Sequence, residues 1–317
     1  MRSFRSGRGA GGALCFVLII VAIHPVELTA QLRSVSDAHA EVVNTRDTLS
    51  QDGKGEFLPS WHAAISNIPV DWLRFASIAF TPRYAPIMAA TAGLTAALVA
   101  TDNATWQRSH QWYTGSGTVK HLSDDVEFVG DGRPQFGLAA AFALYGFMAK
   151  DNRALRTGSQ IVETILASGT VVQVLKHITG RESPFVSTRP GGRWDLFPNQ
   201  IEYSKHVPHY DAFPSGHVTT ALATVTVVVE NYPEWWWARP VGYAAVVLLA
   251  VSMGNTGIHW YSDYPLAVVF GYSFGMIAAH PLETGGLDAA SKPGEPQFSV
   301  GPLLEPQGAG IVMSVSF

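Results

Sequence analysis

Three short stretches of the chain contain side chains that could act as nucleophile, proton donor or anion ligand. Residues 176–184 (KHITGRESP) end one apolar segment, residues 214–217 (PSGH) begin the next, and residues 259–263 (HWYSD) lie between the last two. Each stretch alone is a weak signal, because each also occurs at ordinary helix ends. Their order at the ends of consecutive apolar segments favours one shared site.

Residues 214–217 have the features of an anion site that also contains an acid. At a helix start, Ser215 and Gly216 present free backbone N–H groups and the positive end of the helix dipole, both of which bind anions. Gly216 also permits close approach of the backbone. His217, one residue further, could donate a proton to a leaving oxygen.

His259 and Asp263 are spaced like a nucleophile and the carboxylate that orients it. If the stretch is helical, residues four apart share a face, so Asp263 can accept from one ring nitrogen and leave the other free to attack. A His-x3-Asp pair is also common as a purely structural pair. Lys176 has the same ambiguity, since a lysine at a helix end also complements the helix dipole.

Apolar segments must hold these stretches in place. They are rich in Ala, Gly, Val and Leu, and small residues let helices approach closely. The segments cover residues 84–100, 135–149, 157–175, 215–230, 240–256 and 264–280. They predict an all-α fold with a bundle of six core helices.

The composition favours a bundle embedded in a membrane. The chain is 47% hydrophobic and 15% charged, whereas soluble domains carry about 25% charged residues. The run Trp235-Trp236-Trp237 is typical of an interfacial aromatic belt. Several segments, however, are at or below the lower limit of about 17 residues for a spanning helix, so a tightly packed soluble bundle stays open. A net charge of −4 gives no reason to expect a nucleic-acid partner.

The N-terminus has the layout of a secretory signal peptide. Arg2, Arg5 and Arg8 precede an apolar run, and small residues follow up to residue 30, as at a cleavage site. An uncleaved anchor helix is the alternative. We therefore expect a signal peptide over residues 1–30, a loose polar leader over 31–60, and export to the cell envelope.

The basic residues suggest an orientation. Lys150, Arg153 and Arg156 lie in one short loop, which the positive-inside rule places in the cytoplasm. The loops over 176–214 and 257–263 would then face the periplasm. This count fits a cleaved signal peptide poorly, so either residues 61–81 also cross or the whole bundle is periplasmic.

The last residues differ from the rest. A Gly/Pro-rich linker begins at residue 284, and the segments around 298–304 and 310–317 read as two β-strands joined by a turn. We expect a short C-terminal β-hairpin; the closing strand of an outer-membrane barrel is the alternative. The helical domain would then cover residues 61–283, and the linker and hairpin residues 284–317.

The three stretches together resemble the motifs of the type 2 phosphatidic acid phosphatase (PAP2) superfamily. That family carries Lys-x6-Arg-Pro, Pro-Ser-Gly-His and Arg-x5-His-x3-Asp on a six-helix core, and the likeness here extends over about residues 84–280. The resemblance implies that His259 is a nucleophile that forms a phosphohistidine, that Asp263 orients it, and that His217 protonates the leaving group. It implies a phosphate site made by Lys176, Ser215 and Gly216.

Two arginines of the family pattern are absent. Ser183 replaces the arginine of the first motif, and Met253 replaces the arginine six residues before His259. Neither side chain can replace a bidentate guanidinium. Arg181 is the first candidate to bind phosphate instead, and Arg189 and Arg193 are further candidates.

The resemblance implies a metal-independent phosphatase without a cofactor, acting on a lipid or isoprenoid phosphate or pyrophosphate at a membrane, with its site facing the periplasm. The alternative is a catalytically degenerate protein that binds a phosphorylated headgroup or has a structural role. No metal is expected, because His206 and His209 lack a third and fourth ligand.

Overall fold

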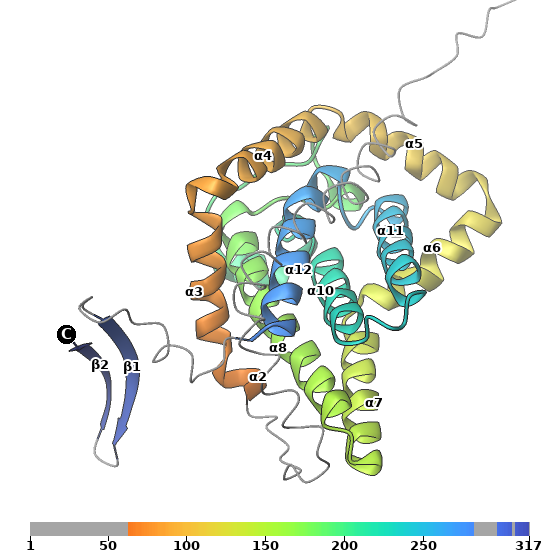
Figure 1. Ribbon diagram of the computed structural model, residues 1–317. Helices are drawn as coiled ribbons and strands as arrows, with labels where there is room; N and C mark the ends of the chain where they lie inside the picture. Colours follow the sequence, from red (N-terminus) through yellow and green to blue (C-terminus); the bar gives the residue numbers. More distant parts are fainter. Residues whose placement is uncertain (1–62, 282–296, 306–307, 317) are drawn as a thin grey trace, which may run out of the picture. The chain divides into compact units, whose positions relative to one another are not determined.

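The computed structural model describes residues 63–281, 297–305 and 308–316. They belong to two units: a helical unit that ends at Ala279, and a second unit, His280–Phe317, that contains two strands (Figure 1). The predicted signal peptide and polar leader, residues 1–60, lie outside the described residues.

The predicted all-α fold is confirmed for the helical unit. Its α-helices are α2 (Ala63–Ser66), α3 (Ile68–Ala79), α4 (Ala85–Val99), α5 (Asp102–Gly115), α6 (Gly117–Gly130), α7 (Arg133–Ala149), α8 (Asn152–Thr179), α9 (Gln200–Lys205), α10 (Gly216–Asn231), α11 (Ala238–Thr256) and α12 (Tyr264–Ala279). Short 3-10 turns are η1 (Pro82–Tyr84), η2 (Pro184–Val186), η3 (Val207–His209) and η4 (Tyr261–Asp263). Each of the six predicted apolar segments is a helix, namely α4, α7, α8, α10, α11 and α12.

Helices α8, α10 and α12 pack together at the centre of the unit (Figure 1). Glycines make the contact between α10 and α12 close. A methyl group added at the Cβ position of Gly271 would lie 2.6 Å from the carbonyl oxygen of Thr219, and one added to Gly275 would lie 2.6 Å from Cβ of Thr226. Alanine would not fit at either position without a shift, so the small residues set the distance between these helices.

Apolar clusters fill the space between the helices. The cluster nearest the predicted site joins α10, α11 and α12 and includes Val218, Leu249, Met253 and Tyr264. A second cluster, including Val172, Phe270 and Phe274, lies between α8 and α12. Phe75 of α3 stacks on Phe274 at 5.0 Å between ring centroids, which attaches α3 to this core.

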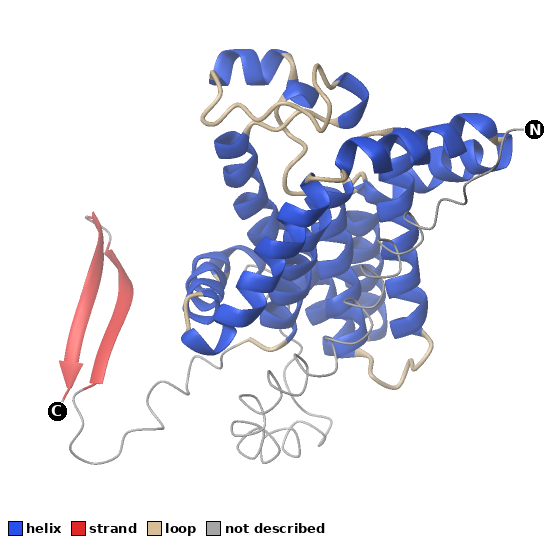
Figure 2. Cartoon of the chain, turned by 90° about the horizontal axis from the view of Figure 1, so that it is seen from above, coloured by secondary structure: helices blue, strands red, loops and turns tan. Residues whose placement is uncertain are grey.

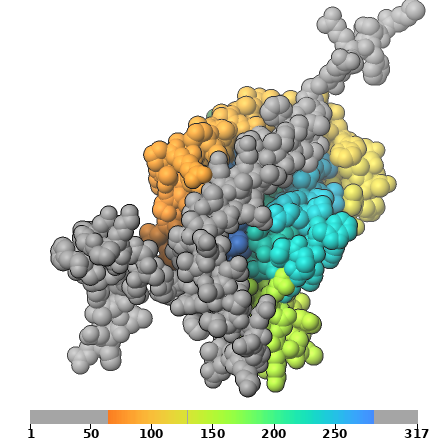
Figure 3. Space-filling view, viewed as in Figure 1, coloured from red at the N-terminus to blue at the C-terminus, as the bar shows by residue number. Residues whose placement is uncertain are grey.

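Membrane insertion remains a prediction. Within the described residues, α8 is the one single helix long and apolar enough to cross a membrane, and 44% of its apolar window is buried in the protein. Residues Pro82–Val99 and Asp102–Gly115 meet the same criterion only as a pair bent by 65°. Large apolar side chains are nevertheless exposed on the surface, including Phe147 and Met148 of α7 and Trp236 next to α11; Figure 3 shows the α10–α11 region in cyan.

The second unit contains the predicted β-hairpin. Strand β1 (Gln297–Glu305) pairs antiparallel with β2 (Gly308–Ser316), and the register runs from Gln297 opposite Ser316 to Glu305 opposite Gly308. Figure 2 shows these two strands in red and the helices in blue.

Candidate active site

The three stretches with candidate catalytic residues meet where α8 ends and α10 begins. Nδ1 of His217 lies 2.9 Å from Nε2 of His259. The backbone N–H of Ser215 donates to the carbonyl oxygen of Asp263 at 3.1 Å. Residues separated by more than forty positions are therefore in direct contact, and Lys176 at the end of α8 completes the group.

The start of α10 provides a cationic environment. Ser215 caps the helix, and its Oγ accepts from the N–H of Val218 at 3.3 Å. A methyl group added to Gly216 would lie 3.8 Å from Nζ of Lys176, so the ammonium group faces the first turn. Lys176 is 4% exposed and pairs with Asp211 at 3.5 Å. An ammonium group beside the positive end of a helix dipole favours an anion at this point.

The hydrogen bonds of His259 determine which nitrogen carries its proton. Nδ1 lies 2.8 Å from the carbonyl oxygen of Ala212, and a carbonyl only accepts, so Nδ1 carries the hydrogen. Burial, reinforced by the charge of Lys176, lowers the pKa of His259 to about 3, so the ring is neutral and Nε2 has a lone pair. Nδ1 of His217 therefore donates to that lone pair. The geometry gives a neutral imidazole whose nucleophilic nitrogen is capped by a second histidine.

Asp263 lies beside His259 but does not form the close hydrogen bond to its ring that a helical spacing predicts. Gly257, at φ +85°, ends α11, and residues 257–260 form a loop before the 3-10 turn η4, so the pair is not on an α-helix. Oδ2 of Asp263 lies 3.5 Å from Nδ1 of His259, and it accepts instead from the N–H of Trp260 at 2.7 Å. The carbonyl of Ala212 is the hydrogen-bond partner of the ring, and Asp263 is a charge beside it. Every residue has a backbone carbonyl, so the sequence could not identify Ala212 as the hydrogen-bond partner of His259.

Arg181 lies behind the two histidines. It is fully buried, and its NH1 nitrogen donates to Asp263 at 2.5 Å and to the hydroxyl of Ser262 at 2.6 Å. Its NH2 nitrogen donates to Asp102 at 2.6 Å and to the carbonyl of Gly191 at 3.1 Å. Both terminal nitrogens are engaged, which differs from the expectation that Arg181 binds phosphate.

This arrangement also affects Asp263. Burial raises the pKa of Asp263 to about 6, and the guanidinium of Arg181 limits the rise. Asp102 carries the second carboxylate that pairs with Arg181, and the sequence motifs do not indicate it. It lies 79 positions before Arg181, at the start of a helix that the apolar pattern did not predict.

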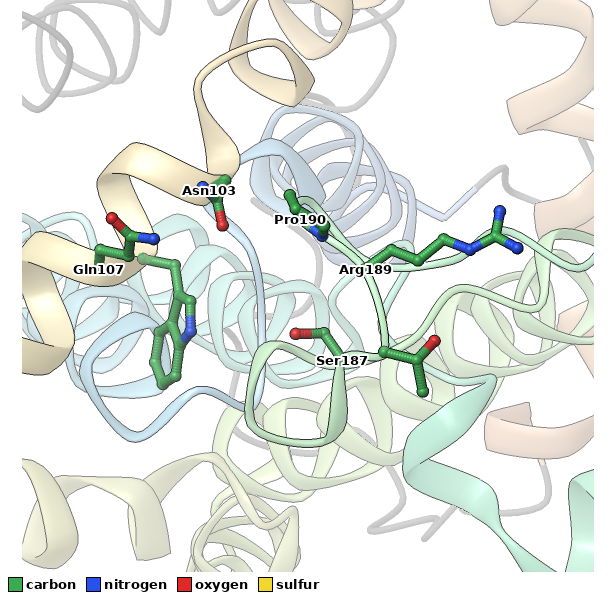
Figure 4. Close-up of a pocket in the computed structure, with 7 residues that line it drawn as sticks. Asn103, Gln107, Ser187, Arg189 and Pro190 are labelled. Atoms are coloured by element: carbon green, nitrogen blue, oxygen red, sulfur yellow. The ribbon is translucent and has the colours of Figure 1, made fainter.

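The other two candidate arginines have different neighbours. The guanidinium of Arg193 lies over the ring of Tyr210. Its Nε is 3.7 Å from Oε1 of Glu182, and its NH2 nitrogen is 3.8 Å from Oδ2 of Asp195. Arg189 lines a surface pocket of about 260 Å³, and Figure 4 shows its guanidinium directed away from Asn103 and Gln107 on the opposite wall. The remaining lining residues are Trp106, Ser187, Thr188 and Pro190. Neither guanidinium has a hydrogen bond or ion pair with His217 or His259 among the contacts of the described residues.

The two positions that lack a motif arginine are buried. Ser183 is 2% exposed, and its N–H donates to the carbonyl of Pro208. Met253 is fully buried in the apolar cluster of α10–α12. A methyl group added to Gly130 would lie 2.8 Å from Cε of Met253 and 3.2 Å from Cδ2 of His217. One wall beside His217 is therefore apolar.

Comparisons with known proteins give one family match. A sequence model of the PAP2 superfamily matches residues 158–283, which include all three stretches. Among solved structures, the chain is similar to the transmembrane PAP2 type phosphatidylglycerolphosphate phosphatase from Bacillus subtilis. The two are 15% identical with a TM-score of 0.42, over 74% of this chain and 100% of that one. No curated protein matches the sequence significantly.

Proposed function

A sequence model of the PAP2 superfamily matches residues 158–283, and on that premise we propose that this protein is a metal-independent phosphatase of that superfamily. The single observation that carries the proposal is the neutral ring of His259, whose Nε2 lies 2.9 Å from His217. A second imidazole at this distance can serve as acid and base to the first. Lys176 and the first turn of α10 would bind the phosphate oxygens of the substrate.

The first step transfers the phosphoryl group to the protein. Phosphate binding separates the two rings, and Nε2 of His259 attacks phosphorus as the bond from phosphorus to the leaving oxygen breaks. The negative charge of the bound phosphate favours the protonated form of His217, which gives its proton to the leaving oxygen. The ring of His259 then bears positive charge, which the carbonyl of Ala212 and the carboxylate of Asp263 stabilise.

The second step returns the protein to its starting state. His217, now neutral, takes a proton from water as the water oxygen attacks phosphorus. The phosphorus–nitrogen bond breaks, the electron pair returns to Nε2 of His259, and inorganic phosphate leaves. The two steps together consume one water molecule and need no other reactant.

The proposed substrate is a lipid or isoprenoid phosphate or pyrophosphate in the cell envelope. Exposed apolar side chains on α7 and beside α11 support a membrane setting. Lys150 follows the end of α7 and Arg153 and Arg156 lie in the first turns of α8, whereas Lys176 lies in the last turns of α8. If that basic cluster faces the cytoplasm, the active site faces the periplasm.

A specific observation favours a second candidate, a protein that binds a phosphorylated headgroup without turnover. Ser183 and Met253 are buried at the positions of the motif arginines, and Arg181 is engaged with two carboxylates. Removing one donor aimed at transition-state charge costs about 10²–10³ in rate. A site that relies on Lys176 and a helix dipole alone could therefore retain binding and lose catalysis.

Phosphate release by the detergent-solubilised protein decides between the two. The panel contains phosphatidate, phosphatidylglycerol phosphate and an isoprenyl pyrophosphate, each with EDTA present. We expect release that His259→Ala abolishes and that His121→Ala, which removes an exposed histidine on α6, leaves unchanged. Absence of release from every substrate by folded protein would favour the binding protein, and release that persists in His259→Ala would refute the histidine mechanism.

A further inference from the structure

Asp102 belongs to a fully buried group of four side chains behind His259. Oδ2 of Asp102 accepts from NH2 of Arg181 at 2.6 Å and from the hydroxyl of Ser262 at 2.5 Å. On the other side of Arg181, NH1 donates to Asp263. Asp102, Arg181, Ser262 and Asp263 are each 0% exposed.

The group contains two carboxylates and one guanidinium. Such a buried cluster has one more acidic group than basic groups. Removing charges from water is costly, so a buried ion pair is weak evidence of a stabilising role. If one carboxylate neutralises Arg181, the charge of the other is available to act on a neighbouring group.

Attachment of α5 does not depend on Asp102 alone. Trp106 packs against the loop before His259, where a methyl group on Gly257 would lie 2.5 Å from its ring. Ser109 of the same helix donates to the carbonyl of Gly254 at 3.4 Å. Helix α5 is thus held on the end of α11 by contacts one and two turns beyond Asp102.

We propose that Asp102 is a positioning residue for the phosphoryl transfer, acting through Arg181 and Ser262 on Asp263. Asp102 holds one side of the guanidinium, so the other side holds the Asp263 carboxylate beneath His259. It also balances the charge of Arg181, so the carboxylate of Asp263 keeps its effect on the ring that becomes positive during the reaction. The inference rests on the proposed function, and it assigns a role to a residue outside the segment that matches the family.

The variant Asp102→Asn tests this role because it removes the charge with little change in shape. Asp124→Asn, which removes an equal charge from an exposed side chain of α6, is the matched control. We expect kcat per folded molecule to fall by about 10- to 100-fold with KM within about twofold of the wild type. The control should match the wild type in both constants.

The pH profile supplies a readout that a purely structural role would not move. The charged and titratable groups around Asp263 are Arg181, Asp102, Lys176, His259 and Tyr264. Loss of the negative charge of Asp102 favours the ionised form of Asp263, so the acid limb of the rate profile should move to lower pH. A lower melting temperature with unchanged kcat per folded molecule and an unchanged acid limb would overturn the proposal.

Ser262→Ala keeps the test decisive if Asp102→Asn does not fold. This change removes the hydroxyl between Asp102 and Arg181 and leaves all three charges in place. A fall in kcat in the same direction supports the positioning role, and an unchanged kcat overturns it. Inactive wild-type protein would refute both this inference and the proposed function, whereas an active wild type with unaffected variants refutes the inference alone.

Discussion

A backbone group and a side chain together determine the protonation of the His259 ring. A backbone carbonyl, Ala212, fixes the hydrogen on one nitrogen, and a side chain, His217, caps the other. Burial keeps the ring neutral, and the same burial makes the nearby carboxyl of Asp263 harder to ionise. The two residues therefore respond to pH in different ranges, and the rate should report on Asp263.

We expect phosphate release to fall as the pH decreases through about 6, where the pKa of Asp263 lies. Protonation removes the negative charge that stabilises the phosphorylated ring. His259, with a pKa of about 3, stays neutral over that interval, so it does not cause the fall. The measurement is the pH profile of kcat/KM between pH 4 and 8, with the melting temperature recorded at each pH.

Asp263→Asn provides the check on this assignment. The variant has no carboxyl to titrate, so its residual activity should lack the acid limb near pH 6. An acid limb that stays at the same pH in the variant would assign it to another group.

Side chains of the candidate site were largely predictable, and their partners were not. Lys176, Gly216, His217 and His259 lie in three short stretches with recognisable chemistry, and the structure brings them together. The role expected for Arg181 depended on its position in a motif, whereas its actual contacts depend on Asp102. Asp102 lies 79 positions before Arg181, in a mostly polar segment whose sequence resembles that of an ordinary surface helix.

At the scale of elements, the contact between α10 and α12 controls the position of the two histidines. His217 lies in the first turn of α10, and the loop that contains His259 leads through η4 into α12. Gly271 and Gly275 let the two helices approach at the distance that this arrangement needs. A substitution that moves α10 and α12 apart should therefore lower both the stability of the protein and its activity.

The variant Gly275→Ala tests the contact. Its new methyl group would lie 2.6 Å from Cβ of Thr226 and 2.9 Å from the carbonyl of Ala223, and such overpacking costs roughly 1–3 kcal/mol. We expect a lower melting temperature and reduced phosphate release. Gly93→Ala on the exposed face of α4, where nothing lies within 4 Å, should be neutral or stabilising by about 0.5–1 kcal/mol. Equal melting temperatures for the two variants would contradict the close-contact interpretation.

Apolar periodicity predicted the helices that build the core, but not those at its edge. Helices α4, α7, α8, α10, α11 and α12 are long apolar runs, and hydrophobicity alone reveals them. Helices α5 and α6 are mostly polar, and they become visible only through their tertiary contacts, such as the packing of Trp106 on Gly257. The residue that the apolar pattern missed, Asp102, is on one of these two helices.

At the scale of the molecule, apolar side chains are unusually prominent on the surface of the helical unit. Phe80 is 88% exposed, Trp236 79% and Met148 75%. Large exposed apolar areas mark contact with a protein partner or a membrane. The tryptophans next to α11 are of the type that favours the membrane–water interface.

Fractionation of expressing cells tests the membrane prediction. We expect the protein to sediment with membranes, to stay there after an alkaline carbonate wash, and to be released by detergent, because its exposed apolar surface would be in contact with lipid. A soluble protein of the same cells is the control for the wash. Recovery of folded, active protein in the soluble fraction would indicate a bundle that does not insert.

The hydrogen bond between His217 and His259 also has a consequence for the protein between turnovers. A free imidazole nitrogen can be alkylated by small electrophiles, and such a modification would block the nitrogen that the proposed reaction needs. Here the lone pair of Nε2 accepts the hydrogen bond from His217, and in the proposed reaction an anionic group held by Lys176 and α10 separates the two rings. If His259 is the nucleophile of the proposed reaction, we expect the resting protein to react slowly with incidental electrophiles, because its nitrogen becomes available only to a molecule that separates the two rings.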